Sequence, residues 1–203
     1  MKPFAGVFGM LALILMASPL YAQSVSGTAL VKALQKGGFI LVMRHASSPN
    51  DPPAKDAANP DNVNRERQLD DQGRDTATEM GAALRRLKIP VGDVFTSPAY
   101  RAIETAHLAQ LPSPQVRAEL GNAAQAMQQV SDDQASWLKS KVLQFQKGTN
   151  TIIITHVPMI VAAFPQWSMG LTDGEALVIG PDAAGGAKLV ARIKIESWPS
   201  LRP

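Results

Sequence analysis

Four residues that could bind and transfer an anion each follow a predicted buried strand. They are Arg44, His45, Arg101 and His156. The first two come directly after the apolar run 39–43, the third lies in a predicted helix after the strand 91–96, and the fourth follows the strand 151–155. In an open α/β sheet, ligands bind at the carboxyl ends of the strands. If these strands are parallel neighbours, the four side chains converge at one edge of the sheet.

These residue types together favour phosphoryl chemistry. Two guanidinium groups can hold a phosphate through fork-shaped, charge-assisted hydrogen bonds. One imidazole titrates near neutral pH and can attack phosphorus, while a second can hold the oxygens of the transferring group. The amino end of the predicted helix after Ser97 adds partial positive charge. The pattern therefore predicts a phosphorylated, anionic substrate.

Strand and helix patterns alternate along the chain. Strands are predicted at 39–43, 91–96, 115–120, 151–155, 177–179 and 188–195, and helices at 26–36, 71–88, from about 99, at 132–146 and at 158–163. This alternation predicts an α/β fold: a three-layer sandwich with a mostly parallel central sheet flanked by helices. Between the first strand and the second helix, residues 46–64 are rich in Pro, Asn, Asp and Ser, which indicates either a long ordered loop beside the site or a flexible lid.

The amino-terminal segment indicates the compartment. Lys2 precedes an uncharged apolar stretch, and Ala22 offers a small residue for cleavage, so residues 1–22 are expected to be a secretory signal peptide. Residues 23–203 then form one domain, in the periplasm or outside the cell. The chain has no cysteine, which excludes disulfides, a thiolate nucleophile and a cysteine-linked lipid. No later segment predicts a membrane span, and a net charge of +3 without a basic run does not favour nucleic-acid binding.

Four segments resemble the histidine phosphatase superfamily, branch 1, the phosphoglycerate-mutase-like group. They are residues 41–46, 69–74, 96–106 and 151–156. The resemblance implies that His45 attacks phosphorus and becomes a phosphohistidine, that Arg44 and Arg101 bind the phosphoryl oxygens, and that His156 completes the pocket. Water then releases phosphate. It also implies that no metal or other cofactor is needed, because cationic side chains neutralise the charge of the transition state.

The sequence departs from this family at two positions and leaves the general acid open. Ala46 stands where the family usually has Gly, and Val157-Pro158 stand where Gly often follows the second His. Glu119 and Glu104 are the candidates for a general acid, but neither lies in a segment that matches an acid motif.

Three functions remain at this point. The first is a phosphatase acting on a phosphorylated small molecule or envelope sugar. The second is a non-catalytic protein that binds phosphate or another anion. The third, a metal-dependent hydrolase, is disfavoured because the chain has only three histidines, none at short ligand spacing.

Several charged or titratable residues have no assigned role. His107 lies outside every motif and is expected at the surface or in packing. Solvated charges are the expectation for Arg65, Arg67 and Arg74, although they could extend the basic edge of the site. The oligomeric state is not predicted.

Overall fold

The computed structural model describes residues 27–121 and 130–203. The predicted signal peptide at 1–22 lies outside them, so its assignment stays a prediction. No helix within the described residues is long and apolar enough to cross a membrane.

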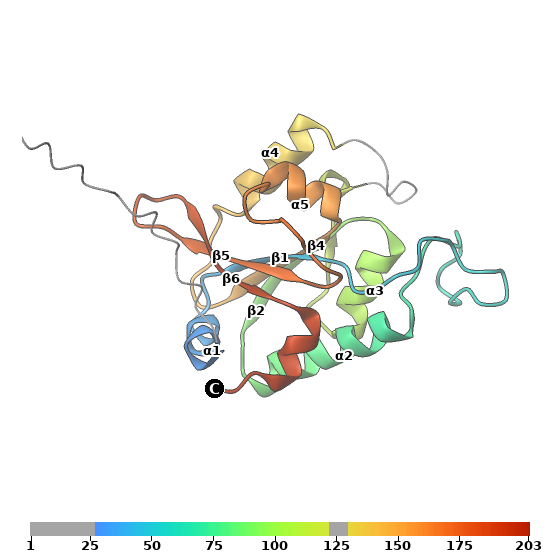
Figure 1. The fold of residues 1–203 in the computed structure, drawn as a ribbon, viewed down its shortest axis with the longest axis horizontal. Coiled ribbons are helices and arrows are strands. Elements are labelled where there is room, and N and C mark those ends of the chain that lie inside the picture. Colours follow the sequence, from blue (N-terminus) through green and yellow to red (C-terminus); the bar gives the residue numbers. More distant parts are fainter. Residues whose placement is uncertain (1–26, 122–129) are drawn as a thin grey trace, which may run out of the picture.

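A six-stranded sheet forms the centre of the molecule, in the order β3-β2-β4-β1-β5-β6 (Figure 1). Its strands are β1 Ile40–Arg44, β2 Val91–Thr96, β3 Gln115–Val116, β4 Asn150–Thr155, β5 Ala176–Pro181 and β6 Ala187–Ile193. The first four are parallel, with β4 between β1 and β2, whereas β5 pairs antiparallel with β1 and β6 pairs antiparallel with β5. The predicted α/β fold with a mostly parallel sheet is confirmed.

Helices cover both faces of this sheet (Figure 1). They are α1 Gly27–Gln35, α2 Asp71–Arg86, α3 Tyr100–Leu108, α4 Asp132–Lys141 and α5 Val157–Ala163, with short 3-10 turns at Ala118–Leu120 and Ile195–Ser200. Successive strand residues point to opposite faces. On β4, Ile152 and Ile154 therefore pack in the core with α1, α2 and α3, while Ile153 packs with α4 and α5.

Two predicted elements are shorter in the structure. The predicted strand 115–120 ends at Val116, because the chain turns through Ala118–Leu120 and buries Leu120 against α4. The predicted helix 132–146 ends at Lys141. Phe145 still packs on the same core from the following turn, since apolar side chains can reach a core from irregular backbone as well as from a helix.

The first turn of α2 is fixed against the chain that follows β1. Asp70 caps the helix by accepting from Gly73 N at 2.7 Å, and it also accepts from Ser47 Oγ at 2.7 Å. A Cβ on Gly73 would lie 2.1 Å from the carbonyl oxygen of Ser47, so only glycine permits this approach. The cap therefore holds the segment that begins two residues after His45.

We expect Asp70→Ala to lower the free energy of unfolding by about 1–2 kcal/mol, because it removes the N-cap of α2. Urea unfolding followed by circular dichroism measures the change. Asp75→Ala, which removes an exposed carboxylate further along the same helix, is the matched control. An equal loss in both variants would contradict the capping role.

Candidate active site

The strand order brings the predicted residues to one edge of the sheet. β4 lies between β1 and β2, all three are parallel, and their carboxyl ends meet at this edge. His45 N donates to Thr155 O at 3.0 Å, so the ladder continues to the first histidine. Ser97 N donates to Ile154 O at 3.0 Å and leads into α3, which carries Arg101. The expected convergence is therefore what the topology produces.

His45 is buried, with 3% of its surface exposed, and its tautomer follows from its two partners. Nδ1 lies 2.7 Å from the carbonyl oxygen of Ala46, so Nδ1 carries the proton and donates it. Arg101 Nε, which can only donate, lies 3.1 Å from His45 Nε2. Nε2 is therefore the unprotonated nitrogen, and its lone pair faces a guanidinium. The methyl group of Ala46 is buried in the core, so the departure from Gly is accommodated.

His156 has the opposite tautomer. Arg101 Nη2 donates to His156 Nδ1 at 3.2 Å, so the proton is on Nε2, which lies 2.8 Å from Ser97 Oγ. The ring centroids of the two imidazoles are 5.3 Å apart in an edge-to-face arrangement. His156 also occupies the N-cap position of α5, without a side-chain capping bond, so Val157 and Pro158 lie in the first helical turn, where proline needs no hydrogen-bonded N–H. This second departure from the family pattern leaves the imidazole in place.

Burial keeps both imidazoles neutral. Desolvation, followed by the neighbouring His156 and the two arginines Arg101 and Arg44, holds the pKa of His45 well below 6.5. Burial, followed by Arg101, Arg67 and Arg44, lowers the pKa of His156 to about 3. At neutral pH each ring therefore keeps one unprotonated nitrogen, and no neighbouring base is needed to remove a second proton.

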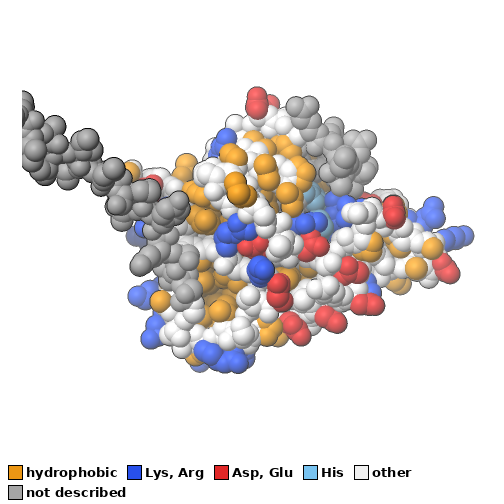
Figure 2. Space-filling view, in the orientation of Figure 1, with side chains coloured by type: hydrophobic (Ala, Val, Ile, Leu, Met, Phe, Trp, Pro, Cys, Tyr) orange, Lys and Arg blue, Asp and Glu red, His pale blue; other side chains and the backbone are white. Residues whose placement is uncertain are grey.

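The positive charge of the site belongs to arginines. Arg101 is 3% exposed, and burial followed by repulsion from Arg67 lowers its pKa to about 10, so it stays protonated at neutral pH. Arg44 is partly exposed and forms a salt bridge with Asp173. Figure 2 shows imidazole surface in pale blue beside Lys and Arg atoms on this face of the molecule. The edge can thus bind an anion.

Arg67 is a third cation of the site, which sequence reasoning treated as a solvated charge. Its Nε donates to Pro49 O at 2.5 Å and its Nη2 to Ser48 O at 3.2 Å. Burial and repulsion from Arg44 lower its pKa. Its position two residues before the segment 69–74 was the available signal, but only the folded loop brings it to the pocket.

Comparison with known proteins places part of the chain in a family. Residues 40–124 match the histidine phosphatase superfamily (branch 1). The resemblance predicted from the sequence is confirmed. No curated protein matches the chain.

Solved structures with this fold are similar over most of the chain. The protein histidine phosphatase SixA bound to tungstate is 18% identical, with a TM-score of 0.56, over 78% of this chain and 98% of that one. A phosphoserine phosphatase variant from Entamoeba histolytica, bound to phosphoserine, is 9% identical with a TM-score of 0.52 over 78% and 98% of the chains. A mycobacterial glucosyl-3-phosphoglycerate phosphatase is 12% identical, with a TM-score of 0.52, over 77% and 98%. At these identities the likeness concerns the histidine phosphatase fold.

Neither predicted general acid contacts the two histidines in the described part of the chain. Glu104 is buried and accepts from Leu69 N at 2.7 Å and from Asn59 Nδ2 at 2.8 Å, while burial raises its pKa. It anchors the loop rather than facing His45. Glu119 lies half-exposed on the 3-10 turn Ala118–Leu120. Among the described residues, no carboxylic acid therefore hydrogen-bonds to His45.

The loop after β1 is ordered by polar contacts with α3, which favours the ordered loop over the flexible lid. Asn59 Nδ2 also donates to Tyr100 Oη at 3.1 Å, and Tyr100 N donates to Glu66 Oε2 at 3.0 Å. The buried Asn62 accepts from Glu66 N at 2.9 Å. Figure 1 shows the loop extending beyond α3. These contacts fix the segment that carries Arg67.

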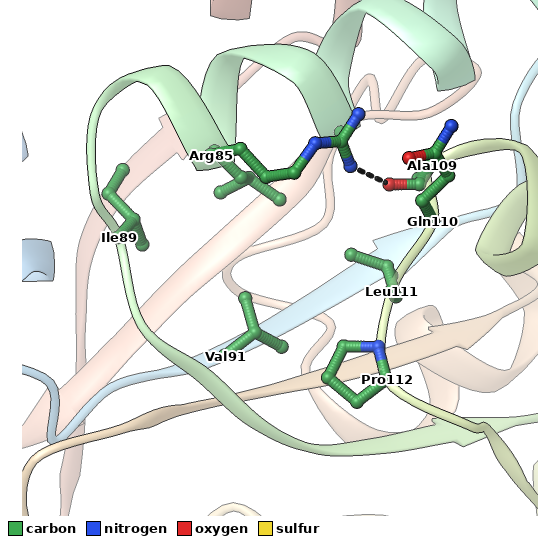
Figure 3. Close-up of a pocket in the computed structure, with 9 residues that line it drawn as sticks. Arg85, Ile89, Val91, Ala109, Gln110, Leu111 and Pro112 are labelled. Atoms are coloured by element: carbon green, nitrogen blue, oxygen red, sulfur yellow. Dashed lines mark hydrogen bonds between the residues drawn. The ribbon is translucent and has the colours of Figure 1, made fainter.

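Two hollows lie outside this pocket. One, of about 160 Å³, lies between the carboxyl ends of α2 and α3, near the amino end of β2, and Arg85 Nη1 donates to Ala109 O there at 2.9 Å (Figure 3). Most of its lining is hydrocarbon, so it offers no group for chemistry. The other, of about 250 Å³, is polar and is lined by Ser47, Gln72, Thr76, Thr172, Asp173, Ile195 and Glu196. Within residues 27–121 and 130–203, no three His, Cys, Asp or Glu side chains group as metal ligands.

The buried neutral histidines predict acid sensitivity. The unfolded chain protonates His156 below pH 6.5, whereas the folded protein does so only near pH 3, so the unfolded state binds more protons in this range. The free energy of unfolding therefore falls as the pH is lowered, by about 2 kcal/mol from His156 between pH 7 and pH 5. Urea unfolding at both values should show a smaller loss in His156→Asn than in the wild type. Equal losses would contradict the neutral, buried imidazole.

Proposed function

We propose that this chain is a phosphatase that hydrolyses phosphomonoesters through a phosphohistidine on His45, without a metal. The observation that carries the proposal is the geometry of His45. Its Nδ1 proton is bound by the carbonyl oxygen of Ala46, and its Nε2 lone pair lies 3.1 Å from Arg101 Nε. A nucleophilic nitrogen thus lies where a guanidinium would hold the phosphoryl group.

The reaction has two displacements at phosphorus. Arg44, Arg67 and Arg101 bind the phosphoryl oxygens, and His45 Nε2 forms a P–N bond while the bond to the leaving oxygen breaks. The arginines stabilise the charge of the loose transition state. Water then attacks phosphorus, the P–N bond breaks, and His45 regains its lone pair as phosphate forms. His156 holds a phosphoryl oxygen and is itself fixed by Ser97.

Within residues 27–121 and 130–203 no carboxylic acid hydrogen-bonds to His45, and this favours certain substrates. Glu104 is bound to the loop, so the leaving oxygen takes its proton from water. Leaving groups of low basicity, such as aryl oxygens, need this proton least. We also propose, from the predicted signal peptide, that the enzyme acts in the periplasm or outside the cell, which favours phosphorylated small molecules or envelope sugars over cytosolic phosphoproteins.

We expect the purified protein to hydrolyse an aryl phosphate equally well with and without a chelator. His45→Ala should lower kcat by at least about 10³-fold, because the nucleophile is lost. An acid-labile phosphoryl group trapped on His45 by rapid quenching would identify the intermediate. His107→Ala, on the exposed face of α3, is the control and should retain full activity.

Other outcomes would favour the other two functions. Phosphate binding without turnover would indicate a non-catalytic anion-binding protein. Loss of turnover with the chelator would indicate a metal-dependent hydrolase. Normal turnover in His45→Ala would exclude His45 as the nucleophile.

Gly121 lies against the ring of His156, so a substitution there can show whether activity depends on the position of this imidazole. Its φ is +127°, and a Cβ there would lie 3.0 Å from His156 Cδ2. We expect Gly121→Ala to lower kcat/KM by about 10- to 100-fold by displacing the imidazole. Gly185→Ala is the matched control, because Gly185 also has a positive φ, +84°, but a Cβ there meets nothing within 4 Å. Equal activity in the two variants would contradict the positioning of His156 by this contact.

A further inference from the structure

Asp173 contacts the phosphate-binding pocket through Arg44. Its Oδ1 forms a salt bridge with Arg44 Nη1, and both side chains are partly exposed, 35% for Asp173 and 26% for Arg44. Asp173 also acts electrostatically on Arg67: burial and repulsion by Arg44 lower the pKa of Arg67, while Asp173 and Asp51 oppose that shift. One carboxylate therefore pairs with Arg44 and offsets the repulsion at a second arginine.

The two residues that follow Asp173 are hydrogen-bonded to the end of β1. Gly174 N donates to His45 O at 2.9 Å, and Arg44 N donates to Glu175 O at 3.2 Å. These bonds fix the position of Asp173 relative to Arg44 and His45, the two residues of β1 and its end that belong to the site. A displacement of this turn would move Asp173 relative to the guanidinium.

An ion pair between the buried Glu175 and the partly exposed Arg192 fixes the turn from its other side. Glu175, 4% exposed, accepts from Arg192 Nε at 2.7 Å, from Thr172 N at 3.0 Å and from Thr172 Oγ1 at 3.1 Å. Burial raises the pKa of Glu175, but these hydrogen bonds outweigh it and hold the pKa below its usual value. Arg192 Nη1 also donates to Met169 O at 2.7 Å. The contacts connect β6 to the turn that carries Asp173.

We propose that Asp173 is a positioning residue that orients Arg44 for the phosphoryl group, and that Glu175 and Arg192 hold Asp173 in place. The inference rests on the proposed phosphate-binding role of the pocket. An arginine side chain is long and loses rotamer freedom when it binds. Asp173 binds one terminal nitrogen and leaves the remaining N–H groups of the guanidinium free to donate.

Two effects of the carboxylate oppose each other, and they can be separated. Asp173 orients Arg44, which strengthens phosphate binding, and its negative charge repels the phosphate, which weakens it. Alanine removes both effects. Asparagine retains an oxygen that can accept from Arg44 but carries no charge. If orientation dominates, only the alanine variant binds phosphate more weakly.

We expect Asp173→Ala to raise the KM for an aryl phosphate and the inhibition constant of inorganic phosphate about tenfold, the scale of one charge-assisted hydrogen bond. The change in kcat should be smaller, because His45 and Arg101 are untouched. Asp173→Asn should bind inorganic phosphate at least as tightly as the wild type. Asp71→Ala, which removes the carboxylate of an exposed Asp–Arg pair on α2, should leave both constants unchanged.

Binding of inorganic phosphate by calorimetry separates this inference from the proposed function. If the wild type binds phosphate without turnover, the phosphatase proposal fails, while a weaker affinity in Asp173→Ala still supports the positioning role. If folded Asp173→Ala binds phosphate as tightly as the wild type, or more tightly, the positioning role is excluded. If folded Asp173→Asn loses as much affinity as Asp173→Ala, the retained acceptor has no effect, and the positioning role is excluded as well.

Discussion

A buried guanidinium between two neutral imidazoles is the interaction on which the site depends. Arg101 donates from Nε to His45 and from Nη2 to His156, and it is almost fully buried. In the part of the chain that the structure describes, no carboxylate forms a salt bridge with it. Burying a cation without a counter-ion is costly. The fold retains an electrostatic imbalance that an anion at this edge would relieve.

The surrounding elements hold the three side chains in these orientations. Arg101 Nη2 fixes the tautomer of His156, whose Nε2 proton then faces Ser97 Oγ, and the carbonyl of Ala46 fixes that of His45. Thr105, one turn after Arg101, donates to Arg101 O and accepts from Ala46 N, so α3 is joined to the end of β1 beside His45. Because Arg101 lies on α3 and donates to both imidazoles, a small shift of α3 would change the hydrogen bonds of both rings at once.

Sequence reasoning succeeded where strong local patterns decide the structure. The apolar runs before His45 and His156 could only be buried strands, and the parallel order β2-β4-β1 then brought their ends together. It failed where contacts distant in sequence decide a role. Glu104 appeared available as an acid one turn after Arg101, but Leu69 and Asn59 bind its carboxylate. Arg67 was predicted to be a solvated charge, but in the structure its hydrogen bonds to Ser48 and Pro49 hold it at the site.

By itself, the sequence determined the fold class, the strand ends that carry the reactive residues and the types of those residues, because hydrophobic periodicity and residue chemistry are local properties. Only the tertiary structure decided which nitrogen of each imidazole is unprotonated, which pKa values burial shifts and which carboxylate forms a salt bridge with Arg44. Those properties depend on the distances between strands β1, β4 and β5 and helix α3, which the chain sets only when it packs. The pair of histidines is therefore visible in the sequence, whereas its electrostatic state arises from burial.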